Sequence, residues 1–337
     1  MRLPRTFRSL VCTASALLCA VSAFAAAPLK IAYSDWPGWT ALAIADQKGW
    51  FREAGVDVEL LWFEYGPSME AFTAGKVDAV TMTNGDALVT GAGGARNVAV
   101  LITDYSNGND MVIARPGIAS LKELKGKKIG IEIGFVEHLL ILNGLKKIGL
   151  SESDVELVPT PTNQTPQVLA SGQVDAIAAW QPNSGEALKA VPGSKSIYSS
   201  ADEPGLIYDT ISVTPQSLAQ RRADWVKVVK VWDKVVAYLA DPATREDGIR
   251  IMAARAGVDP KEYAKFLPGT RLLTLAESSK FFSAKTGSFD SVVGSSKIAD
   301  EFNVKNDVYK ESQDVAAYLD PSLTLEALAA PPAAGGK

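Results

Sequence analysis

The chain has 337 residues, and 47% of them are hydrophobic, which is ample for one large core or two smaller ones. Its formal net charge of −4 at pH 7 argues against nucleic acid or an anionic membrane surface as a partner, since both attract basic proteins. Both cysteines, Cys12 and Cys19, lie in the first 27 residues, so the rest of the chain has no thiol for disulfides, nucleophilic catalysis or thiolate metal sites.

Residues 1–27 have the pattern of a secretory signal peptide. Arg2, Arg5 and Arg8 precede the apolar run LVCTASALLCAVSAF, and the small residues of AFAAAP follow it. The alternative is a membrane anchor, but the apolar run is shorter than the roughly 20 residues that a spanning helix needs. We therefore expect cleavage near residues 25–27 and export to the periplasm. The mature chain would be more acidic than the precursor, because three arginines leave with the leader.

Two later segments repeat one order of predicted elements. The first reads as the strand LKIAYS, the helix TALAIADQKGWFREAG, the strand VDVELLWF, the helix PSMEAFTAG and the strand VDAVTM. The second reads as KKIGIEI, VEHLLILNGLKKIG, DVELVPT, TPQVLASG and VDAIAAW in the same order. Short apolar strands that alternate with helices predict parallel sheets with right-handed crossovers, so the repeat is a duplicated α/β unit.

One short phrase marks the repeat most clearly. AGKVDAV, residues 74–80, returns as SGQVDAI, residues 171–177, and Gly75 and Gly172 are 97 residues apart. In both copies the glycine is expected to end a helix, and the aspartate leads into the next strand. We therefore expect the phrase to shape the backbone at the end of a helix, ahead of any role in binding or catalysis.

The segment between the units and the last third of the chain complete the predicted order. NDMVIARPGIASLKELKGKK predicts a strand, a turn at Pro116 and Gly117, and a short helix with the capping-box pattern Ser120 to Glu123. GLIYDTISVTP predicts a returning strand. Thr214 with Pro215 would then open a long amphipathic helix, whose buried face would hold Leu218, Trp225, Val228, Val229, Trp232, Val236 and Leu239.

Two further proline pairs and a low-complexity end close the chain. Asp241 with Pro242, and Asp259 with Pro260, predict two more helix starts, so helices should fill the last third. The tail LEALAAPPAAGGK has the composition of a disordered segment.

These elements predict an α/β protein of two lobes, with a ligand cleft between two mainly parallel sheets that helices flank. Lobe I would be discontinuous and comprise residues 28–113 and 210–325, and lobe II would comprise residues 114–209. Residues 326–337 would form the disordered tail.

In open parallel sheets, ligands bind beyond the carboxyl ends of the strands, where loops and helix N-termini converge. The ligand-binding residues expected from these strand ends are Ser34, Trp36, Trp39, Glu64, Tyr65, Thr83, Asn84, Asp86, Tyr105, Asn107, Glu132, Phe135, Glu137, Trp180, Gln181, Tyr208 and Asp209. Further candidates at the same strand ends are Asp35, Asp104, Asp110, Thr160, Asn163 and Asn183.

Acids, amides and aromatic rings dominate this set, and it contains no lysine or arginine. An anion would need a cationic partner or a bed of free backbone amides, so the set favours a donor-rich or cationic solute. A ring that covers a planar cation contributes about 0.5–2 kcal/mol. Taken singly, each acid could instead be a solvated loop residue or a helix cap, and the helix dipole alone would account for Glu137. Trp36 and Trp39 flank Pro37 and Gly38 in a loop, which favours a functional role.

Patterns for catalysis are weak. His138 is the only histidine and no nucleophile-elbow pattern accompanies it, so a Ser-His-Asp triad is disfavoured. GAGGAR lacks the last glycine of a dinucleotide fingerprint, and the chain has no GK[ST] phosphate loop. The acids are numerous enough for calcium, but they lack EF-hand spacing. We therefore expect no cofactor, no metal and no enzymatic activity.

KIAYSDWPGW, IADQKGWFREAGVDVEL, AGKVDAV, LKGKKIGIEIGF, SGQVDAIAAWQP and GLIYD resemble the nitrate/sulfonate/bicarbonate (taurine-like) family of periplasmic solute-binding proteins of ABC transporters, over most of residues 28–325. Within it, FEYGPSMEAF, TMTNGDALVTGA, DYSNGNDM and WQPNSG are similar to a subgroup associated with urea-carboxylase gene regions. The resemblance implies a type II periplasmic binding fold that closes on its solute and delivers it to a membrane permease, as a monomer.

The subgroup implies urea-like or guanidinium-like solutes. Many anion-binding relatives have a hydroxyl-rich turn at the first helix of the second lobe, whereas GFVEH here places Phe135 and Glu137 there, which disfavours an oxyanion. We expect Trp180 or Glu132 from lobe II to touch the solute together with Glu64, Asn84 or Asp86 from lobe I, because only a ligand that contacts both lobes can drive closure.

Three alternatives stay open. The solute could be a small anion such as a sulfonate or nitrate. The chain could be an enzyme of the thiamin-pyrimidine synthase type. The resemblance implies that those enzymes depend on a site rich in histidine and cysteine, which the mature chain lacks. It could also be a sensor that reports its ligand to a signalling partner.

Overall fold

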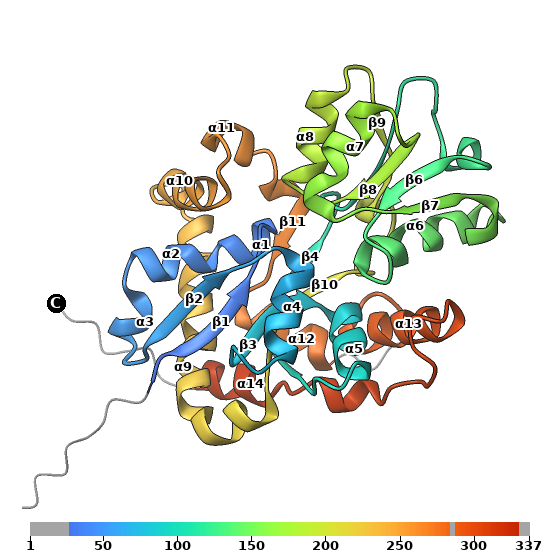
Figure 1. Cartoon of the computed structure of the whole chain (residues 1–337). Coiled ribbons are helices and arrows are strands. Elements are labelled where there is room, and N and C mark those ends of the chain that lie inside the picture. Colours follow the sequence, from blue (N-terminus) through green and yellow to red (C-terminus); the bar gives the residue numbers. More distant parts are fainter. Residues whose placement is uncertain (1–26, 284–286, 330–337) are drawn as a thin grey trace, which may run out of the picture.

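The computed structural model describes residues 27–283 and 287–329, and the fold is built on two separate β-sheets with helices packed on them (Figure 1). The expected signal peptide falls almost wholly outside the described residues. We refer to residues 27–106 and 208–329 as the first half and to residues 111–199 as the second half.

The sheet of the first half has six strands in the order β11-β4-β10-β3-β1-β2. β1 pairs in parallel with β2 and β3, whereas β10 runs antiparallel to β3 and β4, and β11 runs antiparallel to β4. The strands are β1 Leu29–Tyr33, β2 Val58–Trp62, β3 Ala79–Thr83, β4 Val98–Ser106, β10 Tyr208–Val213 and β11 Thr270–Leu272.

The sheet of the second half has five strands in the order β7-β6-β8-β5-β9. β6 pairs in parallel with β7 and β8, and β5 runs antiparallel to β8 and β9. The strands are β5 Met111–Ala114, β6 Lys128–Ile131, β7 Glu156–Pro159, β8 Ala176–Ala179 and β9 Lys195–Ser199. The order β7-β6-β8 repeats the order β2-β1-β3, as the duplicated units predict. Both sheets are mixed, because the strands that connect the halves run against the parallel ones.

The repeated phrase has the same backbone role in both halves. Gly75 and Gly172 adopt left-handed φ angles of 66° and 80°, which glycine takes without strain. The Asp78 carboxylate accepts a hydrogen bond from the backbone N–H of Lys30 at 2.9 Å. The Asp175 carboxylate accepts one from the N–H of Lys128, also at 2.9 Å. Each aspartate therefore fastens the start of its central parallel strand to the neighbouring strand.

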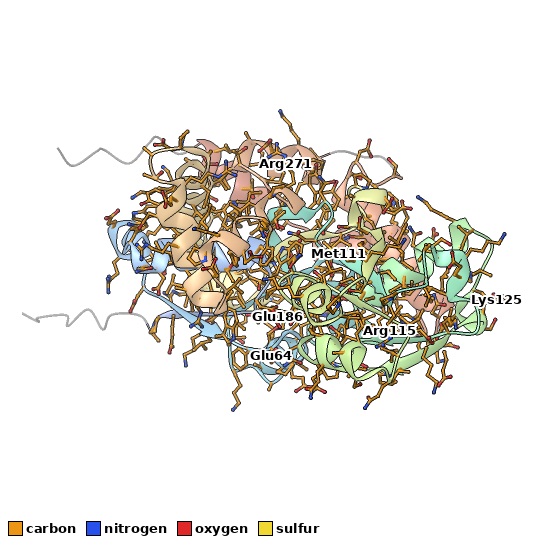
Figure 2. The ribbon with its side chains drawn as sticks, turned by 90° about the horizontal axis from the view of Figure 1, so that it is seen from above. Glu64, Met111, Arg115, Lys125, Glu186 and Arg271 are labelled. Carbon is orange, nitrogen blue, oxygen red and sulfur yellow. The ribbon has the colours of Figure 1, made fainter. Side chains whose placement is uncertain are left out.

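The chain passes between the halves twice, at residues 107–110 and at residues 200–207. Figure 2 shows Met111, the first residue of β5, near the middle of the molecule and Lys125 at the outer end of the second half. β5 pairs only within the second sheet, whereas β10 from Tyr208 onward pairs within the first. The expected lobe limits at 113/114 and 209/210 therefore fall inside β5 and β10. Movement of the halves as two lobes remains a prediction.

Helices of the repeat units follow the predicted order, with one difference. The helix expected over TALAIADQKGWFREAG is three short helices, because Gly49 takes a left-handed φ of 71° and ends the first part of the run. The helices are α1 Pro37–Thr40, α2 Leu42–Gln47, α3 Trp50–Glu53, α4 Tyr65–Thr73, α5 Asn84–Ala92, α6 Val136–Lys147, α7 Thr165–Ser171 and α8 Asn183–Ala190.

Helices fill the last third, as expected. The long helix α9, Pro215–Ala240, is capped by the Thr214 hydroxyl and buries Trp225 and Trp232 against the first sheet's outer helices. The others are α10 Arg245–Ala256, α11 Pro260–Tyr263, α12 Leu275–Ser283, α13 Val292–Lys305 and α14 Ser322–Ala329. Short 3₁₀ turns are η1 Leu121–Leu124, η2 Glu152–Asp154, η3 Thr162–Gln164, η4 Ser200–Asp202, η5 Leu267–Gly269 and η6 Val315–Tyr318.

Two predicted helix limits were wrong. Asp241 and Pro242 form a turn, and α10 begins only at Arg245 after its cap Thr244. The expected tail from residue 325 instead continues α14 to Ala329, because Leu323 and Ala327 bury their side chains in the core beneath α9. Residues 330–337 lie outside the described residues.

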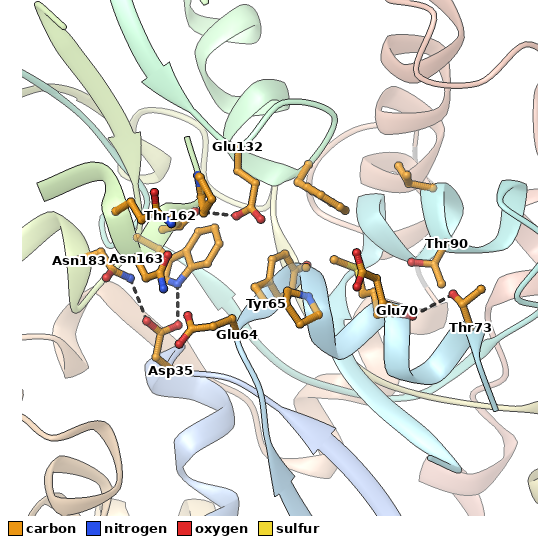
Figure 3. A pocket seen from close by; sticks show the side chains of 18 of the residues that line it. Asp35, Glu64, Tyr65, Glu70, Thr73, Thr90, Glu132, Thr162, Asn163 and Asn183 are labelled. Atoms are coloured by element: carbon orange, nitrogen blue, oxygen red, sulfur yellow. Dashed lines mark hydrogen bonds between the residues drawn. The ribbon is translucent and has the colours of Figure 1, made fainter. Parts of the chain in front are cut away.

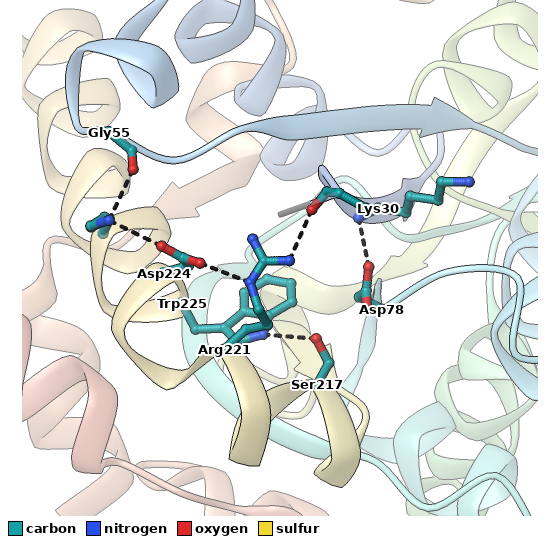
Figure 4. A network of polar contacts seen from close by, with 9 residues as sticks. Lys30, Gly55, Asp78, Ser217, Arg221, Asp224 and Trp225 are labelled. Carbon is teal, nitrogen blue, oxygen red and sulfur yellow. Dashed lines mark hydrogen bonds and ion pairs between the residues drawn. The ribbon is translucent and has the colours of Figure 1, made fainter. Parts of the chain in front are cut away.

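A polar network joins α9 to the first sheet (Figure 4). Arg221, where α9 departs from helical geometry, donates to the Ala27 carbonyl at 2.9 Å and to Asp224 at 2.8 Å. Lys227 donates to Asp224 and to the Gly55 carbonyl. These contacts hold the long helix across the outer ends of β1 and β2, away from the strand ends that carry the candidate site. No helix in residues 27–283 or 287–329 has the length and apolar character to cross a membrane.

Candidate functional site

The two halves enclose a cavity of about 700 Å³ at the carboxyl ends of their parallel strands (Figure 3). We call it the outer cavity. From the first half it takes the loops after β1 and β2 together with α4 and α5, and from the second half it takes the residues after β6, β7 and β8. Its described lining is Asp35, Glu64, Tyr65, Gly66, Pro67, Met69, Glu70, Thr73, Ala74, Val89, Thr90, Gly93, Glu132, Phe135, Pro161, Thr162, Asn163, Gln164, Trp180 and Asn183.

Deeper between the halves lies a second, much smaller space, which we call the inner chamber. Its volume of about 10 Å³ suits about one water molecule. Tyr65 and Trp180 line both spaces and so form the wall between them. The described lining is Trp36, Trp39, Tyr65, Thr83, Asp110, Val136, Trp180, Ile207 and Asp209. No lysine or arginine is among the described residues that line either space.

Four aromatic rings form part of the chamber walls. Trp39 and Tyr65 are stacked, with ring centroids 5.3 Å apart and planes 24° apart. The Trp180 ring meets Tyr65 edge to face at 5.2 Å, and the Trp36 ring meets Trp39 at 6.4 Å. Phe135 contacts Tyr65 from the second half at 6.1 Å. Rings from both halves therefore close around one small space, which presents π faces to whatever occupies it.

Five carboxyl groups surround the chamber, and each is at most 3% exposed. They come from five different elements: Asp86 on α5, Asp104 on β4, Asp110 in the first crossing segment, Glu137 on α6 and Asp209 on β10. None of the five forms an ion pair with a lysine, arginine or histidine of the described part of the chain.

Two of these carboxylates are satisfied by neutral donors. Asp86 accepts a hydrogen bond from the Tyr65 hydroxyl at 2.6 Å. Asp104 accepts from the Trp36 indole N–H and from the Thr103 hydroxyl, each at 2.8 Å. These contacts fix the orientation of Trp36 and Tyr65, so two chamber walls are positioned by buried acids.

The other three carboxyl groups retain unused acceptors. Oδ2 of Asp110, Oδ2 of Asp209 and both carboxyl oxygens of Glu137 have no hydrogen-bond donor among the described residues. A buried polar atom without a partner costs about 1–3 kcal/mol. Asp110 and Asp209 line the chamber, and each also contacts a second buried acid, Glu137 and Asp104 respectively, so these oxygens lack a donor while both acids of a pair are ionised. The Trp39 indole N–H, also in the lining, likewise has no described partner.

Burial and mutual repulsion raise the pKa of every one of these acids. Burial raises the pKa of Asp86 to about 7 and the pKa values of Asp104 and Asp110 to about 6. The pKa of Asp209 is raised well above its usual range by burial and then by the Asp104 carboxylate. Burial and the Asp110 carboxylate do the same to the pKa of Glu137. Asp104 with Asp209, and Asp110 with Glu137, are therefore two carboxyl pairs in contact, and ionisation of one member of each pair disfavours ionisation of the other.

A direct polar bridge joins the halves at the boundary between the two spaces. One Asp35 oxygen accepts from the Trp180 indole N–H at 2.9 Å, and the other accepts from the Asn183 amide at 2.8 Å (Figure 3). Asp35 follows β1 of the first half, whereas Trp180 and Asn183 follow β8 of the second. Nearby, Glu132 accepts from the Thr162 hydroxyl at 2.8 Å, and it faces Glu64 from across the outer cavity. The halves are thus in contact, and we refer to this arrangement as closed.

The structure brings most of the expected binding residues to these two spaces. Glu64, Tyr65, Glu132, Phe135 and Trp180 line the outer cavity. Trp36, Trp39, Tyr65, Thr83, Trp180 and Asp209 line the inner chamber. Ser34, Asp86 and Glu137 are buried but are not part of the described lining; Ser34 Oγ also has no described partner.

Five expected residues have other contacts. The Asn84 amide donates to Ser295 and Ser296, and its oxygen accepts from the Tyr208 backbone, so it fastens α5 to α13 and β10. Tyr105 and Tyr208 pack on one another and on Phe281 in a separate apolar cluster. Gln181 caps the start of α8 at Gly185, and Asn107 pairs through its backbone with Gly269. None of the five lines either space.

Other lining residues were outside the expected binding set. Asp110, Asp35, Asn163 and Asn183 were candidates at strand ends, and the strand-end rule was sufficient to find them. Glu70, Thr73 and Thr90 lie on the flanks of α4 and α5, and Ile207 lies in the second crossing segment. Their positions depend on how the two halves meet, and the chain carries no local signal for that.

Within the described residues, neither a metal-binding cluster nor a histidine occurs in the lining of either space. No cluster of three or more histidine, cysteine, aspartate or glutamate side chains with the geometry to hold a metal occurs within the described residues. His138 lies outside the described lining of both spaces, with its ring against Phe302 and its Nε2 3.6 Å from Glu152. Burial lowers the pKa of His138, which favours the neutral form.

Comparison with protein families finds a match at residues 36–245 to the model described as NMT1/THI5 like. Among curated relatives, a protein of Brucella abortus (strain 2308) with the provisional name of binding protein is 32% identical over 177 residues. The alignment covers 52% of this chain and 54% of that protein, so the chain spans about half the length of the curated relatives it matches.

Solved structures with the same fold include a binding protein and an enzyme. The periplasmic aliphatic sulphonate binding protein of Escherichia coli gives a TM-score of 0.72 at 20% identity, covering 86% of this chain and 91% of that one. The desulfurization enzyme DSZB gives a TM-score of 0.61 at 17% identity, covering 89% of this chain and 99% of that one. At such identities the likeness shows the α/β fold of two sheets and leaves the ligand to the residues of the site.

Proposed function

Because the chain belongs to the NMT1/THI5-like family and its two halves close on an acid-lined interior, we propose that it is the periplasmic solute-binding component of an ABC importer. Its solute is a small, nitrogen-rich molecule, neutral or cationic, of the guanidine or urea type. The protein captures this solute between its halves and delivers it to the permease. The observation that carries the proposal is the inner chamber, whose lining combines four aromatic side chains with two buried acids that each have an oxygen without a described donor.

The chamber matches planar N–H donors in its chemistry. The free oxygens of Asp110 and Asp209 accept N–H bonds, while Trp36, Trp39, Tyr65 and Trp180 cover the faces of a planar solute. In the closed arrangement the chamber suits about one water molecule, so its walls must move slightly even for a solute of a few non-hydrogen atoms. A larger molecule would hold the halves apart.

The anion alternative meets the wrong charges. The Escherichia coli structural relative is described as a sulphonate binding protein, but a sulfonate here would face carboxylates and no described lysine or arginine. The backbone amide at the start of α6, a position where helices commonly bind anions, interacts with the Asp86 carboxylate instead. The place that an oxyanion would use is therefore already taken by an acid of the protein itself.

Urea is a second candidate for a specific reason. The Trp39 indole N–H lines the chamber without a described partner, and it would donate to a carbonyl oxygen, which urea has and guanidinium lacks. For the enzyme alternative, the single histidine lies away from the chamber and the mature chain has no cysteine. A ligand sensor would use the same site, and permease and ATPase genes beside this one would favour the importer.

Calorimetry with the mature protein tests the solute class. Guanidinium, methylguanidinium and urea are titrated in parallel with nitrate, taurine and a short alkanesulfonate. We expect at least one of the nitrogenous solutes to bind and the anions to show no heat. Binding of an anion tighter than any nitrogenous solute would overturn the proposal.

Substitution of chamber acids locates the site. Asp209→Asn and Asp110→Asn each remove a carboxylate that would bond the solute, and we expect affinity to fall roughly 10- to 100-fold, since a hydrogen bond to a charged group contributes about 1.5–3 kcal/mol. Glu59→Gln is the matched control, because it removes an exposed acid on β2. Equal affinity in all three variants would place the solute elsewhere.

A further inference from the structure

Resting on the proposed function, we infer that the solute binds as a cation in the inner chamber and displaces a proton from the Asp104–Asp209 carboxyl pair, so that each binding event releases a proton to the solvent. The released proton comes from the Asp209 carboxyl group, and the carboxylate that remains pairs with the cation. No other co-reactant is needed, because one positive charge replaces another.

The first step is the charge balance of the empty chamber. Within the described residues no basic side chain lines the chamber, and no ion pair involves the five surrounding acids. An uncompensated buried carboxylate costs several kcal/mol, whereas protonation removes this cost. The empty, closed protein therefore holds protons where a cation would otherwise be.

One carboxyl group of the two pairs presents its proton to the chamber. In each pair one carboxyl group lines the chamber: Asp209 in one and Asp110 in the other. Asp209 holds its proton more firmly than Asp104, because Asp104 is stabilised as an anion by Trp36 and Thr103. In the other pair only Asp110 lines the chamber, and Glu137 lies outside the described lining. The protonated group that an incoming cation meets is therefore the Asp209 carboxyl group.

The third step is the response of Asp209 to a cation. The charged groups that face Asp209 are Asp104 from β4, Asp110 from the crossing segment and Asp86 from α5, all of them acids. Those that face Glu137 are Asp110, Glu132 and Asp86, again all acids. A cation at the free Asp209 oxygen is therefore the first positive charge in this environment, and it favours the ionised carboxyl group over the protonated one. A neutral solute such as urea provides no such charge.

Proton release separates the two solute classes experimentally. The mature protein is titrated with guanidinium chloride at pH 6.5 in cacodylate, phosphate and Bis-Tris buffers, whose ionisation enthalpies differ widely. We expect the measured heat to depend on the buffer with a slope equivalent to release of roughly one proton. Affinity should also rise with pH, by up to about tenfold per pH unit, and level off once Asp209 is ionised in the empty protein. Urea, at the same pH, should bind without any dependence on the buffer if it binds.

Substitutions test which carboxyl pair releases the proton when guanidinium binds. Asp209→Asn should abolish the dependence on the buffer and weaken guanidinium binding about 10- to 100-fold, whereas Glu137→Gln should retain the proton release. Glu59→Gln should reproduce the original protein in both respects. Should a variant fail to fold, the buffer series with the unmodified protein still decides the matter.

The outcomes distinguish the inference from the proposed function. Guanidinium binding without proton release would overturn the inference and leave the function standing. Proton release that survives in Asp209→Asn would overturn the assignment to the Asp104–Asp209 pair. If neither guanidinium nor methylguanidinium binds while urea or an anion does, the cation inference fails, and binding of an anion alone refutes the proposed function as well.

Discussion

At the scale of single residues, the molecule is distinguished by acids that are buried without a basic partner. Asp110 and Asp209 retain oxygens that no described donor satisfies, at positions where an apolar side chain of similar size would stabilise the closed form. When ionised, these two residues destabilise the empty protein, and hydrogen-bond donors on a solute would relieve this cost.

Gly38 is a residue whose only role is to leave room. A Cβ atom at this position would lie 2.0 Å from Oδ2 of Asp104, which is held in place by Trp36 and Thr103. In Gly38→Ala the carboxyl group must move and release the Trp36 ring, so we expect a stability loss of about 1–3 kcal/mol. Solute affinity should fall at least tenfold, measured by calorimetry after denaturant unfolding has established the fraction folded.

Gly287→Ala is the control for this substitution. Its Cβ would meet nothing within 4 Å, so stability and affinity should both stay close to those of the unmodified protein. Unchanged affinity in Gly38→Ala would mean that the position of the Asp104 carboxylate does not matter to the site.

Sequence alone predicted where acids would gather but not which side chains would point inward. Strand order places Trp36, Glu64, Thr83 and Trp180 at one edge of each sheet, so their lining positions followed from topology. Tyr208 is also at a strand end, but β10 runs antiparallel to β3. The Tyr208 side chain is therefore directed into the cluster with Phe281. That direction depends on the register of a strand pair far apart in the sequence, which no local pattern encodes.

At the scale of elements, the two parallel units are fastened by the same device. Asp78 and Asp175 each accept the N–H of the first or second residue of a central strand. Asp78→Ala and Asp175→Ala should each lower the free energy of unfolding by about 0.5–1.5 kcal/mol, because each removes one hydrogen bond at the sheet edge. Denaturant titration measures both effects, and solute affinity should not change.

Asp57→Ala serves as control, since it removes an exposed aspartate beside the same sheet without such a bond. A large loss in one of the two test variants and none in the other would show that the repeated aspartate does not have the same role in both halves.

The ends of helices were predicted correctly where a local capping pattern determines them. They were predicted wrongly where packing against distant parts of the chain determines them. The Thr214–Pro215 and Asp259–Pro260 starts were correct, because a capping side chain and proline determine them locally. Asp241–Pro242 has the same pattern, yet α10 begins at Arg245. Likewise the composition of LEALAA suggested disorder, but burial of Ala327 extends α14 over it.

At the scale of the whole molecule, closure depends on contacts that join the halves. Asp35 bridges them through Trp180 and Asn183, and these bonds exist only while the halves are together. In Asp35→Ala both bonds are lost from the closed form, so we expect the solute to dissociate about tenfold faster or more, with the association rate little changed. Stopped-flow tryptophan fluorescence measures both rates.

The exposed acid Asp46 on α2 provides the comparison, and Asp46→Ala should dissociate at the original rate. An unchanged dissociation rate in Asp35→Ala would show that the bridge forms without stabilising the bound state.

The carboxyl cluster also sets how the empty protein responds to pH. In the folded chain burial raises the pKa of Asp86 to about 7 and the pKa values of Asp104 and Asp110 to about 6, whereas an unfolded aspartate titrates near 4. The folded state therefore binds more protons between about pH 4 and pH 7, so its stability is greatest below this window and is lost as pH rises through it. We expect the Tm of the empty protein to fall by roughly 5–10 °C between pH 5 and pH 8.

A bound cation should remove this dependence, because it provides the positive charge that the protons provided. With saturating guanidinium the Tm should change little between pH 5 and pH 8, and the stabilisation by solute should be largest at pH 8. Differential scanning calorimetry at the two pH values, with and without guanidinium, measures Tm under all four conditions. Small-angle scattering of the same samples reports whether the empty protein opens at pH 8. If the empty protein is as stable and as compact at pH 8 as at pH 5, the acids do not repel one another across the cleft. Closure on binding would then need another cause.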